Sequence, residues 1–300
     1  MLTDLQVAIF GGDARQLEVI RKLAEQGANL VLVGFDQLDH GFTGASKMDI
    51  GEVVFSKLDV IILPVNGTGP NGEIDTIFSN KRIILTAEHL KRTPKHCHVY
   101  SGITNAYLDK IVSQSGKGHT QLFDRDDVAI YNSIPTVEGT LMMVIQNTDT
   151  TIHNSNTVVL GFGRVGMSVA RAFDALGANV KVGARKPEHL ARISEMGFIP
   201  FHLDHLQKEV TNTDVCINTI PFQIVTSGVI SKMPTQTLII DLASKPGGTD
   251  FKYAEKRGIK ALLAPGLPGI VAPKTAGQIL GNVLSQLIGE QMSTRKGKVE

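Results

Sequence analysis

Three glycines in the second half of the chain have a spacing suited to holding phosphate groups. Gly161, Gly163 and Gly166 form G-x-G-x-x-G between an apolar run at 157–160 and an amphipathic stretch at 165–176. In such a loop the first glycine permits a tight turn, the second lets a pyrophosphate approach bare backbone, and the third allows close packing of helix on strand. The helix N-terminus adds unpaired N–H groups. The pattern therefore predicts a dinucleotide site, and its other loop residues are Phe162, Arg164 and Val165.

The residues after the next predicted strand indicate which dinucleotide is bound. About 20 residues beyond the glycines, an NAD-binding protein places a carboxylate for the ribose hydroxyls. This chain instead has Gly183, Ala184, Arg185 and Lys186. A 2′-phosphate would meet no carboxylate here, and the planar guanidinium of an arginine binds phosphate through two parallel hydrogen bonds. We therefore expect NADP(H), with a solvated basic turn as the alternative.

Two more loops follow predicted strands of the same half. NTIP follows the strand 215–218 with Thr219, Ile220 and Pro221, and DLASKPGG follows the strand 238–241 with Leu242, Ala243 and Ser244. Ligands of open α/β sheets lie outside the carboxyl ends of the strands. We expect both loops to border the nicotinamide end of the cofactor, although simple turns would explain the same residues.

The stretch IFGGDARQ at 9–16 imitates the glycine pattern near the start of the chain. Gly11 occupies the first glycine position, but Asp13 stands at the second and Gln16 at the third. A carboxylate would repel the pyrophosphate, so the pattern predicts a nucleotide-binding shape without the site. Asp13 is a candidate helix cap and, beside Arg15, a candidate substrate contact. Arg15, at the same helix start, is a candidate for binding a substrate carboxylate, with an exposed helix arginine as an equal alternative.

SIPTVEG, residues 133–139, predicts a helix that begins at Pro135. Ser133, Thr136 and the first N–H groups of this helix would then cradle a carboxylate. Glu138 is a candidate general base, although glutamate in a first turn usually interacts with the helix dipole.

APGLPGIVAPKTAG, residues 264–277, resembles a substrate loop in its proline and glycine content. Gly266 and Pro268 are candidate substrate contacts, and Lys274 at the start of the last predicted helix would contact an anionic substrate. An interdomain hinge would have the same composition. His119, on a polar stretch expected to be a loop between domains, is a candidate proton acceptor. The histidines show no metal-binding spacing, and no metal site is predicted.

The composition limits the classes of protein that the chain can represent. With 300 residues, about two domains are expected. Lys and Arg total 30 against 29 Asp and Glu, so neither nucleic acid nor a membrane surface is an expected partner. Two cysteines do not form a disulfide framework, and neither a secretory signal nor an apolar run of about 20 residues is evident. A cytoplasmic protein is expected.

Alternation of strand-like and helix-like patterns predicts an α/β protein with two Rossmann-like domains, each with a parallel sheet. The helix at 274–291 is expected to return to the N-terminal domain. The predicted strands are 7–10, 30–33, 60–63, 82–86, 98–100, 157–160, 180–182, 215–218 and 238–241. The predicted domains are an N-terminal substrate domain (1–134 plus 274–292), an interdomain helix and linker (135–150), an NADP-binding Rossmann domain (151–273) and a flexible tail (293–300).

Taken together, GGDARQ, NSIPTVEGTLMM, VLGFGRVG, INTIP, DLASKPGG and PGLPGIVAPKTAG resemble the family of dipicolinate synthase A subunits over essentially the whole chain. The resemblance implies NADP-linked oxidation of a dihydro- or hydroxytetrahydro-pyridine dicarboxylate to dipicolinate in the mother cell of a sporulating bacterium. It also implies that the partner is a flavoprotein-like B subunit. The implied architecture is similar to that of formate/glycerate and alanine dehydrogenases, with a cleft between two domains. A homo-oligomer is expected.

Two other functions fit the same residues. An amino- or imino-acid dehydrogenase of the alanine dehydrogenase type would need only one anchor for a substrate carboxylate. A protein that senses NADPH without turnover would need the cofactor loop alone.

Overall fold

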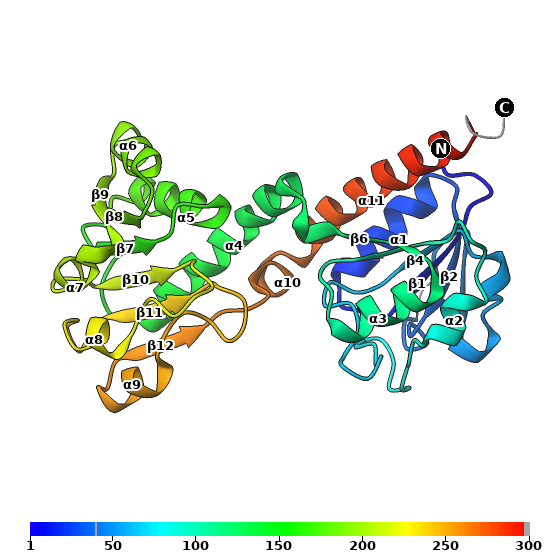
Figure 1. Cartoon of the computed structure of the whole chain (residues 1–300), viewed down its shortest axis with the longest axis horizontal. Coiled ribbons are helices and arrows are strands. Elements are labelled where there is room, and N and C mark those ends of the chain that lie inside the picture. Colours follow the sequence, from blue (N-terminus) through cyan, green and yellow to red (C-terminus); the bar gives the residue numbers. More distant parts are fainter. Residues whose placement is uncertain (40, 297–300) are drawn as a thin grey trace. The chain divides into compact units, whose positions relative to one another are not determined.

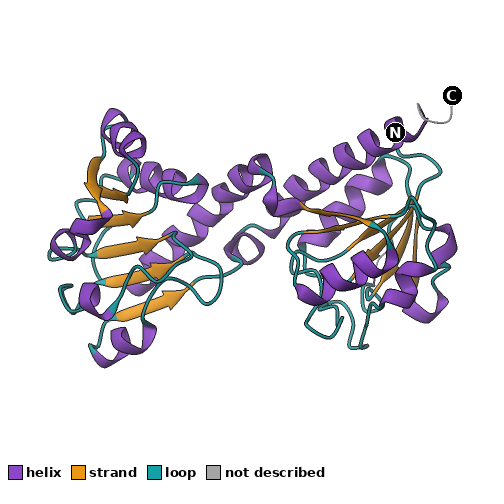
Figure 2. Cartoon of the chain, in the orientation of Figure 1, coloured by secondary structure: helices purple, strands orange, loops and turns teal. Residues whose placement is uncertain are grey.

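The computed structural model describes residues 1–39 and 41–296. The chain divides into two compact units, which we call unit 1 (Met1–Ala129 and Ala272–Glu300) and unit 2 (Ile130–Val271). Each unit contains one six-stranded parallel sheet with helices outside it (Figure 2). The predicted α/β fold with two Rossmann-like domains is confirmed.

Unit 1 places its first strand in the middle of the sheet, where all four residues from Val7 to Phe10 are fully buried. The strand order is β3-β2-β1-β4-β5-β6. The strands are β1 (Gln6–Phe10), β2 (Asn29–Val33), β3 (Ala45–Met48), β4 (Val60–Ile62), β5 (His98–Ser101) and β6 (Gly118–Gln121). The helices of this unit are α1 (Arg15–Glu25), α2 (Ala87–Lys91), α3 (Ala106–Ser115) and α11 (Pro273–Lys296).

Helix α11 packs alongside α1, as predicted (Figure 1). The contact is close because α11 presents a glycine: a Cβ on Gly277 would lie 2.4 Å from the carbonyl oxygen of Arg15. The helix runs through Lys296 and so includes residues 293–296 of the predicted tail, whose flexibility stays a prediction. Residues 297–300 of that predicted tail lie outside the described residues.

Unit 2 repeats the same strand order, β9-β8-β7-β10-β11-β12, which is the dinucleotide-binding arrangement. Its strands are β7 (Asn156–Leu160), β8 (Asn179–Ala184), β9 (Ile199–His202), β10 (Val215–Asn218), β11 (Leu238–Asp241) and β12 (Lys260–Leu263). Its helices are α5 (Arg164–Ala175), α6 (Pro187–Glu195), α7 (Leu206–Glu209), α8 (Ser227–Ile230), α9 (Phe251–Lys256) and α10 (Leu267–Val271).

Helix α4 (Asp126–Asn147) differs from its prediction, because it begins at Asp126 and contains Pro135 in its interior. Asp126 and Asp127 supply the negative charge that favours a first helical turn. The division between the units falls inside this helix, after Ala129. The segment predicted as an interdomain helix and linker, 135–150, is helical through Asn147.

By length and composition, α4 is also apolar enough to cross a membrane, contrary to the sequence expectation. It nevertheless contributes to one hydrophobic core of each unit. Val128 is buried in unit 1, and Val137 and Val144 are buried in unit 2. A core helix satisfies the same criterion, and these buried residues account for the apolar composition of α4.

The predicted strand at 82–86 is wrong, since only Ile84 forms a ladder contact there, an isolated antiparallel bridge with Glu73. Ile83 and Leu85 are nevertheless 3% and 0% exposed. The apolar alternation thus reflected burial rather than sheet pairing. The sequence also missed strands β3, β6, β9 and β12, which lie towards the outside of the two sheets.

Candidate cofactor and substrate sites

The loop between β7 and α5 has the backbone that the glycine spacing predicts. Gly161 adopts a φ of +97°, and a Cβ on Gly166 would lie 2.1 Å from the carbonyl oxygen of Gly161. Gly163 is exposed, and a Cβ built on it meets nothing within 4 Å. No side chain caps the N-terminus of α5, whose first residues are Arg164 and Val165. The open approach and uncapped helix start fit a bound pyrophosphate.

Two cations lie where β8 ends. Ala184 is buried, whereas Arg185 and Lys186 are exposed. Within 1–39 and 41–296, neither of these two side chains makes a hydrogen bond or ion pair. The backbone at this point is held, because the ring Nε2 of His202 donates to the carbonyl oxygen of Arg185 at 3.1 Å. The cations are thus available to a phosphate.

The NTIP loop packs against the glycine loop. The Thr219 hydroxyl donates to the carbonyl oxygen of Leu160 at 2.8 Å, and a Cβ on Gly161 would lie 2.5 Å from the same hydroxyl. Ile220 is half-buried, while Pro221 is exposed. The loop therefore borders the glycine turn, and its place beside the nicotinamide stays a prediction.

The DLASKPGG loop is built on a buried carboxylate that the sequence analysis did not single out. Asp241 accepts a hydrogen bond from the backbone N–H of Ala243 at 3.0 Å and another from the side chain of Asn218 at 3.0 Å. Leu242 is half-buried and Ser244 exposed. A polar residue that ends each of two buried strands was the available signal for Asn218 and Asp241.

Both cysteines are buried free thiols. Burial, followed by the interaction with Asp241, raises the pKa of Cys216 to about 12. Burial also raises the pKa of Cys97 to about 11. Neither is a reactive thiolate near neutral pH.

The corresponding loop of unit 1 is already occupied by the chain itself. The N–H of Gly12 donates to the carbonyl oxygen of Asp75 at 2.7 Å, and the N–H of Ile77 donates to the carbonyl oxygen of Gly12 at 3.0 Å. A Cβ on Gly11 would lie 2.7 Å from the Asp75 carbonyl oxygen. The segment 74–77 thus covers the position at which a pyrophosphate would approach.

The side chains of Asp13 and Arg15 bind each other at the start of α1. The Asp13 carboxylate accepts the backbone N–H of Arg15 at 3.0 Å and is bound by its guanidinium at 2.6 Å. Burial tends to raise the pKa of Asp13, but the hydrogen bonds and charge of Arg15 outweigh it and lower the pKa. The Arg15 side chain is 11% exposed, so the alternative of a solvated arginine is wrong.

The predicted carboxylate cradle in α4 is wrong. Ser133 is 1% exposed, and its hydroxyl donates to the carbonyl oxygen of Ile130 and contacts the hydroxyl of Ser168. The Thr136 hydroxyl donates to the carbonyl oxygen of Asn132. Because both residues lie inside a helix, the N–H groups around them are not the free groups of a helix start. Glu138 is exposed on the same helix.

His119 lies in strand β6 and not in the predicted loop. Its Nε2 is 2.8 Å from the Ser101 hydroxyl, which is buried at the end of β5. Burial lowers the pKa of His119 despite the opposing carboxylates of Asp109 and Asp124. The lowered pKa favours the neutral form of the ring.

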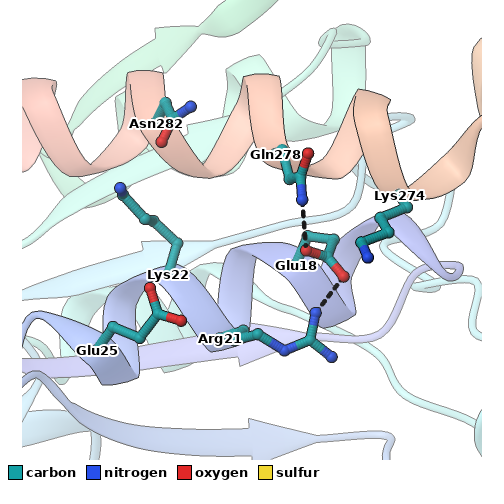
Figure 3. Close-up of a pocket in the computed structure, with 7 residues that line it drawn as sticks. All are labelled: Glu18, Arg21, Lys22, Glu25, Lys274, Gln278 and Asn282. Atoms are coloured by element: carbon teal, nitrogen blue, oxygen red, sulfur yellow. Dashed lines mark hydrogen bonds and ion pairs between the residues drawn. The ribbon is translucent and has the colours of Figure 1, made fainter.

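The remaining candidates belong to different units. Lys274, exposed in the first turn of α11, lies beside Glu18 of α1 and lines a surface groove of about 650 Å³ (Figure 3). In unit 2, Gly266 is exposed with a φ of +71°, and Pro268 is buried in α10. Across the described residues, no group of three or more His, Cys, Asp or Glu side chains is placed to hold a metal ion.

Comparisons with known proteins agree with this geometry. Residues 6–123 match the N-terminal domain of the dipicolinate synthase A subunit, and residues 133–299 match the alanine dehydrogenase/PNT C-terminal domain. The dipicolinate synthase A subunit of Bacillus subtilis (strain 168) is 63% identical over 271 residues, which cover 90% of this chain and 91% of that protein.

Solved structures show the same relationship. The crystal structure of the dipicolinate synthase A subunit from Bacillus halodurans is 61% identical, with a TM-score of 0.95 over 96% of this chain and 99% of that one. The crystal structure of the Bacillus subtilis protein has a TM-score of 0.94 over 98% and 99% of the two chains. A transhydrogenase from Sinorhizobium meliloti, 14% identical, shares the fold, with a TM-score of 0.67 over 94% of each chain.

The alanine dehydrogenase-type domain makes this protein an oxidoreductase, and its cofactor a nicotinamide nucleotide. The glycine loop of unit 2, the two family domains in sequence and 63% identity over 90% of the chain lead to one conclusion. The chain belongs to the dipicolinate synthase A-subunit family.

Proposed function

We propose that the protein is an NADP-dependent oxidoreductase that oxidises a dihydro- or hydroxytetrahydro-pyridine dicarboxylate to dipicolinate. The observation that carries the cofactor assignment is the end of β8, where Arg185 and Lys186 are exposed, have no side-chain partner among the described residues, and stand where an NAD-binding protein has a carboxylate. The family membership supports the product, since the relatives from Bacillus subtilis and Bacillus halodurans are both named dipicolinate synthase.

Unit 2 is the proposed cofactor unit. The uncapped start of α5 and the bare backbone at Gly163 would bind the pyrophosphate, and Arg185 would bind the 2′-phosphate. The NTIP and DLASKPGG loops, with Thr219 and Ser244, would border the nicotinamide. Bound NADP⁺ would supply the hydride acceptor.

Unit 1 is the proposed substrate unit. Arg15 would bind one substrate carboxylate, and this carboxylate would compete with Asp13 for the guanidinium. His119 would accept the proton that leaves with aromatisation, because its imidazole is held neutral beside Ser101. Formation of an aromatic ring makes the oxidation favourable, so positioning matters more than strong electrostatic activation.

The family also suggests the protein's setting. We propose that its partner is a flavoprotein-like B subunit, that it assembles into a homo-oligomer, and that it works in the mother-cell cytoplasm during sporulation. Copurification with the B subunit from sporulating cells would test the partner directly.

Isothermal titration with NADP⁺ and NAD⁺ tests the cofactor assignment. We expect tighter binding of NADP⁺, and Arg185→Ala should weaken it by about 100-fold while leaving NAD⁺ affinity unchanged, since only NADP⁺ carries the 2′-phosphate. Arg257→Ala, an exposed arginine that ends α9, is the matched control. Equal affinity for both nucleotides, indifferent to Arg185, would remove the assignment.

Turnover separates the proposed reaction from its alternatives. With a dihydrodipicolinate substrate and NADP⁺, the near-ultraviolet absorbance of NADPH should rise continuously. Turnover of alanine instead would indicate an amino-acid dehydrogenase. A single change in the spectrum of bound cofactor, with no turnover in the presence of the B subunit, would indicate a sensor.

A further inference from the structure

In the part of the chain that the structure describes, Asp241 is the one charged residue whose side chain is fully buried. It has no cation as partner there, and four donors take its place. Its Oδ1 accepts from Asn218 Nδ2 and from the N–H of Ala243, both at 3.0 Å. Its Oδ2 accepts from the N–H of Gly248 at 2.8 Å and the Thr249 hydroxyl at 2.6 Å. A buried carboxylate is tolerated only with such full hydrogen bonding.

Three of these donors lie in the β11 loop (242–249), and the fourth, Asn218, is the last residue of β10 and immediately precedes the β10 loop (219–225). Besides contacting Asp241, Asn218 holds its own loop, because its Nδ2 donates to the carbonyl oxygen of Ile220 and its Oδ1 accepts the N–H of Ile220, both at 3.0 Å. The carboxylate therefore fixes the start of the β10 loop and both ends of the β11 loop.

Backbone contacts join the same two loops further along. The carbonyl oxygen of Gly248 accepts the N–H groups of Ile224 and Val225, each at 2.9 Å. A Cβ on Gly248 would lie 2.4 Å from the carbonyl oxygen of Phe222 and 2.6 Å from Asn218 Nδ2. The loops thus touch at a point where no side chain fits. Through the Thr219 hydroxyl, the β10 loop also bonds the strand that leads into the glycine loop.

We propose that Asp241 is a positioning residue that locks the β10 and β11 loops into one arrangement for the cofactor. The inference deepens the proposed function, because it assumes that both loops border the nicotinamide of the dinucleotide. Asp241 itself is fully buried and acts through Ala243, Gly248, Thr249 and Asn218. Loosening any of these bonds would loosen both loops together.

Thr249→Val tests the lock with little change in shape, because it removes one donor to the carboxylate. Thr249→Ser keeps the hydroxyl and is the rescue variant. Thr237→Val is the matched control: Thr237 is also buried, precedes β11 at its other end, and donates to the carbonyl oxygen of Thr213 at 2.6 Å. Each variant is measured by hydrogen exchange without ligand, by thermal melting and by titration with NADP⁺.

We expect Thr249→Val to speed exchange in both loops and to weaken NADP⁺ binding by roughly tenfold, the effect of losing one hydrogen bond to a charged group. Thr249→Ser should restore both, and Thr237→Val should lower thermal stability without either change. Faster exchange confined to 242–249, equal effects of the two valine variants, or unchanged NADP⁺ affinity would each overturn the proposal. If the unmodified protein binds neither nucleotide, the proposed function fails, and exchange in the two loops alone decides whether Asp241 couples them.

Discussion

The two units share one strand order but differ in the loop that follows their first strand. In unit 2, Gly163 is exposed with open space before it, and no side chain caps the helix behind it. In unit 1, the backbone of Asp75 and Ile77 is hydrogen-bonded to Gly12 at the equivalent edge of the sheet. A shared strand order therefore does not by itself create a nucleotide site. A site also requires a loop whose backbone N–H groups are not already hydrogen-bonded within the protein, so that a ligand can bind them.

The comparison is tested most strongly by adding one methyl group to each loop. Gly163→Ala should leave thermal stability unchanged, because its Cβ meets nothing and its φ of −92° is ordinary. It should nevertheless weaken NADP⁺ binding by about 100-fold, since the methyl group stands where the pyrophosphate approaches. Titration calorimetry and thermal melting measure the two effects.

Gly12→Ala is the counterpart in unit 1. With a φ of +101° and a Cβ only 2.6 Å from Gln16 Cγ, it should cost about 1–2 kcal/mol of unfolding free energy and leave NADP⁺ affinity intact. The reverse pattern, with nucleotide affinity lost at Gly12 and kept at Gly163, would exchange the roles of the units.

A second contrast concerns α11, which belongs to unit 1 although it follows unit 2 in the sequence. Gly277→Ala should destabilise unit 1 by about 1–3 kcal/mol, because its Cβ would lie 2.4 Å from backbone at Arg15. Gly289→Ala, on the same helix with nothing within 4 Å, should stabilise it by about 0.5–1 kcal/mol. Urea unfolding with hydrogen exchange resolved by unit measures both. If Gly277→Ala is neutral, unit 1 does not depend on this close helix contact.

The segment that covers the unit 1 loop can be loosened at Thr76. Its hydroxyl donates to the carbonyl oxygen of Gly34 at 2.8 Å and accepts the N–H of Phe78 at 3.1 Å. Thr76→Val should cost about 1 kcal/mol in urea unfolding, whereas Thr104→Val, which removes a hydroxyl that donates to the exposed carboxylate of Asp109, should cost less. In a Gly163→Ala background, Thr76→Val should restore no nucleotide binding. Restored binding would mean that unit 1 retains a working site beneath this segment.

The smallest expected effect is a difference in acid sensitivity. Burial lowers the pKa of His89, His98 and His119, all in unit 1, from the ordinary value of 6.5. As the pH falls, these histidines bind protons more readily in the unfolded chain than in the folded unit. Unit 1 should therefore lose stability as the pH falls below about 6.5. Urea pulse proteolysis at two pH values, with cut sites identified by mass, should show earlier cleavage in unit 1 in acid. His119→Gln should reduce the difference, and a pH-independent pattern would contradict it.

The sequence predicted those features that depend on neighbouring residues. The glycine spacing around Gly161 identifies a strand, a turn and a helix in order, and the structure contains all three. Features that depend on distant partners were missed. His119 looked like a loop residue because β6 is short and polar and becomes a strand only by pairing with β5.

The predicted start of α4 at Pro135 is also wrong, and the reason is related. Pro135 is typical of a first helical turn, but here the helix had already begun at Asp126. The pairing of Asn218 with Asp241 is also beyond local inference, because the two residues lie 23 apart in sequence and meet only across neighbouring strands.

The return of α11 to unit 1 also sets an order for folding during synthesis. Ile288 of this helix is fully buried in the core that contains Val19 and Ile20 of α1. A ribosome makes α11 after every strand of unit 2, so unit 1 cannot complete its core until unit 2 has been synthesised. Unit 2 is continuous from Ile130 to Val271 and meets no such delay. The nascent chain would then complete unit 2 first. Until α11 is made, the face of α1 that α11 covers would stay exposed in unit 1.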